Sequence, residues 1–274
     1  MADEIDYKIY GEDLQFVEIG LDYGETVISE SGAMLYMRGG IKMDTTASTK
    51  NEGVVGKLFS IGKRVLTGES LFLSTFTNMS SRKAYVAFAA PYPGKIVPLN
   101  LKATGSILCQ KDSFLCGARG VDIDIAFTKK FGTGLFGGEG FILQKLKGDG
   151  YVFVHAGGTL YEINLEEGEK LKVDTGCIVA FSQSVKYDIE FVSNIKTAFF
   201  GGEGLFLAVL IGPGKVYLQS LPFSRLADRI YKAMPQHGGK RGEGSILGGL
   251  GNICLLYTSP SPRDLSTSRM PSSA

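Results

Sequence analysis

The run Gly201-Gly202-Glu203-Gly204-Leu205-Phe206-Leu207, GGEGLFL, occurs three times along the chain in related forms. It reads GGEGFIL at residues 137–143 and TGESLFL at residues 67–73. Its glutamates stand at positions 69, 139 and 203, which is a nearly constant spacing. A period of this size is typical of a protein built from repeated structural units. The sequence therefore predicts three similar units.

Matching segments flank each run. In one set of flanking segments, apolar and acidic residues alternate with period two, which is typical of a half-buried strand. A shorter segment, also similar in the three units, precedes each of them. The alternating segments are residues 41–44, 121–125 and 187–191, and the pieces before them are residues 33–37, 113–116 and 177–181. Short glycine-containing loops at 147–150 and 212–215 predict hairpins between the strands that follow the second and third runs.

The repeat is offset from the ends of the chain. Residues 7–44 supply the back half of one unit, and the third run supplies the front half of another. We therefore predict an all-β, closed antiparallel architecture of three similar repeats with pseudo-threefold symmetry. In such a ring a strand from 7–21 lies beside one from 205–221, and closure removes exposed sheet edges.

Two segments have helical periodicity, so one or two short capping helices are expected. Apolar residues recur at helical intervals over 53–66. A stronger pattern covers 224–234, where Ser224 can cap the first turn and Pro235 ends the helix. Residues 1–235 then form a single three-repeat β domain. Residues 236–253 are a glycine-rich tether, and residues 254–274 form a disordered tail whose sequence resembles translated sequencing-adaptor read-through.

Composition excludes several classes of function. The formal net charge is +1, which gives no electrostatic argument for a nucleic-acid partner. Four cysteines without a CxxC pair and two histidines provide no metal-ligand spacing. The first residues, MADEIDYKIYG, lack the pattern of a targeting sequence, and the longest apolar run is too short to cross a bilayer. We expect a cytoplasmic protein without a cofactor or metal.

The residues that could form a cofactor or catalytic site are better explained as structural residues. Residues 132–137 match GxGxxG, but a β-rich segment follows where a dinucleotide site needs a helix. His155 shares a strand face with Tyr151 and Phe153, which predicts a hydrogen-bonded sheet histidine rather than a catalytic base. Cys109 and Cys116 are expected to be small buried apolar residues. The acidic pairs in the alternating segments are expected to face solvent, so the protein is not expected to be an enzyme.

The glycine-glutamate turns are the candidate binding or structural turns. Two roles remain open for them. An inward ring of three carboxylates would raise a pKa or recruit a cation, whereas outward glutamates would accept backbone N–H bonds that fix their own turns. The residues concerned are Glu69, Gly138, Glu139, Gly140, Gly202, Glu203 and Gly204.

These runs, together with SESGAMLYM at residues 29–37 and the Gly-Pro-Gly loop, resemble the altered-inheritance-of-mitochondria protein 24 family, also called domain of unknown function 124. The resemblance covers roughly residues 5–235. It implies a β-rich fold of three similar units, related in shape to the tryptophan RNA-binding attenuator protein. It also implies a link to mitochondrial inner-membrane organisation, known for eukaryotic members, and offers a mitochondrial location as the alternative. The family supplies no established catalytic residues.

The sequence thus favours a non-enzymatic structural or assembly protein that acts through protein partners or self-association. The alternative is a small-ligand or nucleic-acid binding module of attenuator-like fold. A membrane-surface role through the basic segment 53–66 is the less favoured use of that segment, because it carries only three cations. Clustered Lys and Arg on one face would favour nucleic acid, while an exposed apolar patch would favour assembly.

Overall fold

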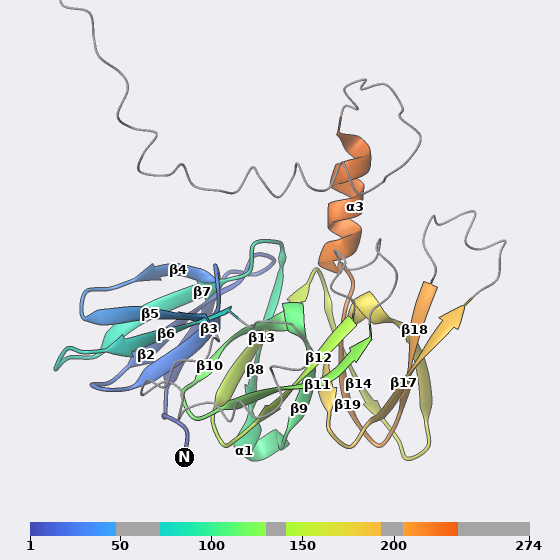
Figure 1. The fold of residues 1–274 in the computed structure, drawn as a ribbon, viewed down its shortest axis with the longest axis horizontal. Helices are drawn as coiled ribbons and strands as arrows, with labels where there is room; N and C mark the ends of the chain where they lie inside the picture. The colour runs from blue at the N-terminus through green and yellow to red at the C-terminus, as the bar shows by residue number, and fades with distance from the viewer. Residues whose placement is uncertain (48–71, 130–140, 193–204, 235–274) are drawn as a thin grey trace, which may run out of the picture. The chain divides into compact units, whose positions relative to one another are not determined.

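A computed structural model describes residues 1–47, 72–129, 141–192 and 205–234 (Figure 1). The chain divides into two compact units, Met1–Lys232 and Ala233–Ala274. The fold described below is that of the first unit. The predicted helix at 53–66, the GxGxxG segment at 132–137 and the tail at 254–274 lie outside the described residues.

The described chain is mainly strand, as the alternating sequence pattern predicts. Short helices interrupt it at α1 (Leu101–Thr104), η3 (Lys111–Ser113) and η5 (Thr175–Cys177), and α3 (Phe223–Ala233) follows the last strand. The strands are β1 (Asp6–Tyr10), β2 (Phe16–Leu21), β3 (Thr26–Glu30), β4 (Met34–Met37), β5 (Ile41–Ala47), β6 (Phe72–Asn78), β7 (Ala84–Ala89), β8 (Gly94–Asn100), β9 (Ile107–Gln110), β10 (Phe114–Ala118), β11 (Asp122–Lys129), β12 (Phe141–Lys147), β13 (Tyr151–Gly157), β14 (Leu160–Leu165), β15 (Lys170–Asp174), β16 (Ile178–Ser182), β17 (Lys186–Val192), β18 (Leu205–Ile211) and β19 (Gly214–Gln219).

Three successive groups of six strands share one order of pairing. The first group is β2 to β7, the second is β8 to β13, and the third is β14 to β19. In each group the sixth strand pairs with the first and the third, and the fifth strand pairs with the second and the fourth. The three third strands carry the same bulge after their first paired residue, at Met34, Phe114 and Ile178. A threefold axis relating the groups stays a prediction.

Neighbouring groups are joined because the second strand of one pairs with the third strand of the next. β3 pairs with β10, and β9 pairs with β16. These two junctions make the six-stranded sheets β5-β6-β3-β10-β13-β8 and β11-β12-β9-β16-β19-β14. The remaining sheets are smaller, with the orders β1-β2-β7-β4 and β15-β18-β17. Every pairing among the named strands is antiparallel, as predicted.

Apolar side chains fill the space between the sheets in three clusters. In the cluster of the first group, Phe76 and Phe88 are fully buried with their rings 5.2 Å apart, edge to face. Leu146 and Val152 belong to the second cluster, and Phe181 belongs to the third. Burial of this kind contributes about 1.5–3 kcal/mol for each large side chain and drives the layers together.

Two predicted connections are wrong. The loops at 147–150 and 212–215 do not close hairpins, because the strands on either side enter different sheets. β12 pairs with β9 and β11, whereas β13 pairs with β8 and β10. Gly148 at the turn has φ 130° and lies against the backbone of Gly120, so the chain can change layer within a few residues.

Closure of the ring by the first and last strands is also wrong. Among the described strands, β1 and β2 pair with each other and with β7. The strands of 205–221, β18 and β19, pair with strands of their own group. Second and third strands form the junctions between groups. The third strand of the first group, β4, and the second strand of the third group, β15, instead stand at sheet edges, and sequence periodicity does not single them out.

Candidate interaction surfaces

The seven predicted turn residues, Glu69, Gly138, Glu139, Gly140, Gly202, Glu203 and Gly204, lie outside the described residues. What the structure does describe is the strand that each run leads into. These strands are β6, β12 and β18, the fifth strand of each group. In the described part of the chain, no group of three or more His, Cys, Asp or Glu side chains is placed to hold a metal ion.

His155 is a core residue of β13. Its side chain is buried, and its ring meets that of Tyr92 edge to face at 4.6 Å. The predicted hydrogen bond is missing at one nitrogen, since Nδ1 is buried without a partner. Burial lowers the pKa of His155 to about 4, so the ring is neutral at physiological pH. The edge-to-face contact with Tyr92 therefore helps to hold this histidine in the core.

The cysteine and acidic-pair predictions are confirmed. Cys109 and Cys116 are free and fully buried, and burial raises the pKa of both thiols. In β17 the residues alternate as predicted, with Ile189 buried while Asp188 and Glu190 are exposed. The buried thiols are therefore core residues, and the acids of β17 lie on its solvent face.

A first exposed surface, the β4 edge, consists of Met34, Leu35, Tyr36 and Met37. β4 pairs only with β7 among the described strands. Leu35 is 52% exposed and Met37 is 43% exposed, although the strand contains no charged residue. Natural proteins usually protect an edge strand with charges or prolines, because an open edge can pair with another chain.

Polar contacts fix the β4 edge to its sheet. The hydroxyl group of Tyr36 donates to the carboxylate of Glu18, and this hydrogen bond raises the pKa of Tyr36. Glu18 lies on β2, and its carboxyl side chain is buried. Tyr10 also donates to it at 3.2 Å, and Arg38 forms an ion pair with it at 3.5 Å. The small Ala87 lies between Glu18 and Tyr36 in the sheet register, which lets the two side chains meet.

A second edge, the β15 edge, consists of Lys170, Leu171, Lys172 and Val173. β15 pairs only with β18 among the described strands. Both lysines are exposed, and Lys172 forms an ion pair with Glu190 at 2.7 Å. Leu171 and Val173 point into the third core cluster. This edge therefore carries the charged protection that β4 lacks.

A third surface, the helix surface, consists of Phe223, Ile230 and Tyr231 on α3. The helix confirms the prediction at 224–234, but its apolar residues do not cover the core as a cap would. Ile230 is 56% exposed and Tyr231 is 50% exposed. The start of α3 is fixed by Phe223, whose ring lies 5.3 Å from that of Tyr92, and by Arg225, which pairs with Asp174 at 2.6 Å.

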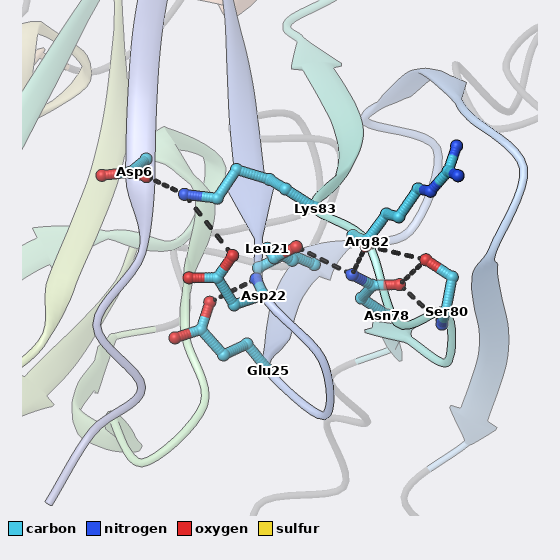
Figure 2. Close-up of polar contacts among 8 residues, drawn as sticks. All are labelled: Asp6, Leu21, Asp22, Glu25, Asn78, Ser80, Arg82 and Lys83. Carbon is cyan, nitrogen blue, oxygen red and sulfur yellow. Dashed lines mark hydrogen bonds and ion pairs between the residues drawn. The ribbon is translucent and has the colours of Figure 1, made fainter.

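A polar cluster at the turns of the first group is structural (Figure 2). Asn78 is fully buried, and its side-chain amide donates to the carbonyl oxygens of Leu21 and Arg82, each at 2.8 Å. Its side-chain oxygen accepts from the backbone N–H of Ser80 at 2.9 Å. Lys83 forms ion pairs with Asp6 and with Asp22 in the same region. These bonds join the turn after β2 to the turn after β6.

The third group repeats part of this turn chemistry. Glu25 accepts the backbone N–H of Asp22 at 2.7 Å, and Glu169 accepts that of Glu166 at 2.8 Å. Both turns place a glycine with positive φ before the glutamate. Burial raises the pKa of the Glu25 carboxyl. Turn-fixing glutamates are therefore present, at positions other than the glycine-glutamate runs.

Sequence reasoning missed the functional potential of β4 and of Glu18. The available signals were local. Met34-Leu35-Tyr36-Met37 has four large side chains in a row without alternation, and a single carboxylate interrupts the apolar strand FVEIGL at Glu18. Neither signal shows which strand stands at a sheet edge, because that depends on pairing between distant segments.

Comparison with known proteins confirms the predicted resemblance. Residues 7–221 match the model of a family described as mitochondrial biogenesis AIM24. An uncharacterized protein of Streptococcus pyogenes serotype M6, M6_Spy0233, is 28% identical over 220 residues, which cover 80% of this chain and 86% of the relative. A crystal structure of protein SPYM3_0169 from Streptococcus pyogenes is 24% identical and has a TM-score of 0.67, over 84% of this chain and 100% of that one. That structure shows a shared fold. The chain therefore belongs to the mitochondrial biogenesis AIM24 family.

Proposed function

We propose that this chain is a non-enzymatic assembly protein that acts through protein–protein contacts. The observation that carries the proposal is the helix surface. A helix of eleven residues presents Ile230 and Tyr231 to solvent at half or more of their area. Exposed apolar side chains gathered on one face of an ordered element mark an interaction site.

The attachment of α3 supports the same use. Its first turn is held by Tyr92 and by Asp174, so the helix is presented by the β fold rather than buried in it. An amphipathic helix of this kind binds by laying its apolar face into a groove on a partner. Burying Ile230 or Tyr231 there would contribute about 1.5–3 kcal/mol for each side chain.

The distribution of charge favours a protein partner over a nucleic acid. Described cations with ion-pair partners are spread over many elements and include Arg38, Lys42, Lys83, Lys95, Arg119, Lys147, Lys172, Lys215 and Arg225. Paired cations do not provide the continuous basic stripe that phosphate binding uses. Within the described ranges, no helix is both long and apolar enough to cross a bilayer.

The test uses Ile230→Asp in the full chain, with Arg229→Asp as the matched control. Both variants place an acid on the exposed part of α3, but only Ile230 belongs to the helix surface. Tagged wild-type and variant chains are expressed in the native cell and captured, and the retained proteins are identified and then rebound in purified form. We expect a defined protein to bind the wild type and the control, and to be lost from Ile230→Asp.

Two results would reject the proposal. One is binding of the wild type to vesicles with an anionic surface, abolished by Ile230→Asp, with no protein retained; this would make α3 a membrane element. The other is equal retention of every captured protein by wild type and Ile230→Asp. Circular dichroism of both variants confirms that the β fold is intact before either result is used.

A further inference from the structure

We propose that copies of this chain associate head to tail, with the β15 edge of one copy pairing antiparallel with the β4 edge of the next. This inference deepens the proposed assembly function by naming one partner as a second copy of the chain. It rests on the order of strand pairing in the described residues, not on the helix surface.

In strand order, the two small sheets correspond to the two halves of a six-stranded sheet, with β1 added at one edge. Each six-stranded sheet consists of the fourth, fifth and second strands of one group, followed by the third, sixth and first strands of the next. The sheet β15-β18-β17 is the first of these halves, from the third group. The strands β4, β7 and β2 are the second half, from the first group. Joining β15 to β4 would therefore produce the same six-strand order as the two sheets already formed.

The formed junctions predict the register of the new one. Ser29 lies opposite Cys116 in the first junction, and Cys109 lies opposite Ala180 in the second. Within each group, pairing with the sixth strand places Tyr36 at the position of Cys116 and Ala180. Pairing with the fifth strand likewise places Val173 at the position of Cys109. The expected partners are thus Val173↔Tyr36, Lys172↔Met37 and Leu171↔Arg38.

The backbone hydrogen bonds repeat as well. Arg119 N–H donates to the carbonyl oxygen of Thr26 at 2.9 Å, and Gln183 N–H donates to that of Ser106 at 3.2 Å. The equivalent bond in the new junction runs from Gly39 N–H to the carbonyl oxygen of Lys170.

The N–H of Met37 is free to join this ladder. Arg38 N–H donates to Tyr85 on β7, so the N–H of Met37, one residue earlier on an extended strand, points away from β7.

Burial distinguishes the open edges from the formed junctions. Every residue of β10 and β9 is buried, and both strands lie at junctions. On β4 three of four residues are exposed, and on β15 Lys170 and Lys172 are exposed. None of the expected cross-strand pairs places two like charges opposite each other, which would oppose pairing. The stem of Lys172 can cover Met37 while its charge stays with Glu190.

A second copy is the partner that fits both edges. Among the described strands, no pairing joins the first group to the third, so β4 and β15 of one chain do not meet each other. Each copy offers one edge of each kind. Such unlike edges give a head-to-tail contact, which closes into a ring or continues as a filament.

The first test measures molar mass by light scattering over a concentration series. The wild-type chain is expected to exceed its monomer mass of 29.5 kDa. Met37→Pro removes the outward N–H of β4, and Lys172→Pro blocks β15 in the same way. Each variant alone should be a monomer. An equimolar mixture should form a dimer and stop there, because one intact β15 edge meets one intact β4 edge.

A second set of variants avoids proline, in case proline unfolds the strands. Met37→Lys places a cation opposite Lys172 and should weaken association by about tenfold, whereas Met37→Glu should not. Combining Met37→Lys with Lys172→Glu in one chain should restore association. Ile230→Asp should leave the molar mass unchanged, which separates this inference from the helix-surface function.

Several outcomes would overturn the inference. The first is a wild-type chain that stays monomeric throughout the concentration series. This result would count against the inference even if the two edges paired with each other within one chain. The second is self-association that survives in Lys172→Pro alone, because that would mean that β4 edges pair with each other. The third is a mixture of the two proline variants that does not associate although both are folded.

Discussion

Cys109 on β9 lies directly opposite Ala180 on β16, at the register position at which Ser29 lies opposite Cys116 in the preceding junction. Each pair combines small side chains, and Cys109, Cys116 and Ala180 are fully buried. Neighbouring groups of strands are therefore joined by one repeated backbone pairing. This relationship makes the sheet edges, not the glycine-glutamate turns, the positions from which assembly can be predicted.

His155 should make the protein less stable in mild acid. Burial lowers its pKa from 6.5 to about 4, so the unfolded chain binds the proton first as the pH falls. The stability that comes from keeping His155 neutral is fully present above pH 6.5. It is lost progressively as the pH falls through about 4, and the total loss is about 3 kcal/mol. His155→Phe should flatten this part of the pH dependence in urea unfolding between pH 7 and 4.5. Equal slopes for variant and wild type would contradict the assignment, and Tyr92→Phe is the control.

Replacing Glu18 should destabilise the first group. Glu18→Ala leaves the half-buried hydroxyl of Tyr36 without its acceptor and should cost about 1–3 kcal/mol in urea unfolding. Tyr36→Phe alone should cost about 1 kcal/mol. The double variant should cost less than the sum of the two, by about 1 kcal/mol or more, because one interaction is counted twice. Strict additivity would show that the contact is energetically silent.

Asn78→Ala should loosen the turns shown in Figure 2. The amide joins the backbone oxygens of Leu21 and Arg82 in a fully buried site. Their loss should lower the free energy of unfolding by about 2–3 kcal/mol. Ser80→Ala, which removes a hydroxyl at the partly exposed side of the same cluster, should cost less than half as much. Hydrogen exchange at these turns would locate the effect, and a larger loss in Ser80→Ala would refute it.

Gly94→Ala should be strongly destabilising. A Cβ at Gly94 would stand 2.2 Å from the carbonyl oxygen of Ala156 and 2.5 Å from Nε2 of His155. Relief requires backbone movement between β8 and β13, which should cost about 2–3 kcal/mol or more. Gly39→Ala, with nothing within 4 Å of its Cβ, should change stability by about 0.5 kcal/mol at most. Similar melting temperatures for both variants would contradict the geometry.

Local patterns predicted individual elements well. The alternation at 121–125 and 187–191 is found as β11 and β17, and the apolar stripe after Pro222 is found as α3. The shorter matching pieces at 33–37, 113–116 and 177–181 overlap the third strand of each group, β4, β10 and β16. These features depend on side-chain periodicity within a few residues, which a sequence shows directly.

The pairing partners could not be predicted in this way. A short glycine loop such as 147–150 is compatible with a hairpin and also with a change of layer. The residues of the loop do not distinguish the two connections. The buried environment of Glu18 likewise arises from Tyr10, Tyr36 and Arg38, which reach it from outside its own strand. A contact between distant segments leaves no local periodic signal.

By itself, the sequence determined that the chain is built of antiparallel strands with a recurring glycine-glutamate run, and that it resembles one family. Alternation of apolar and polar residues decides which face of a strand is buried, and that is a property of each strand alone. Only the tertiary structure decided that β3 meets β10, that β9 meets β16, and that β4 and β15 remain at sheet edges. Strand order is set by backbone hydrogen bonds and core packing between segments far apart in the chain. The free energy of those contacts depends on both segments together, so neither segment alone predicts it.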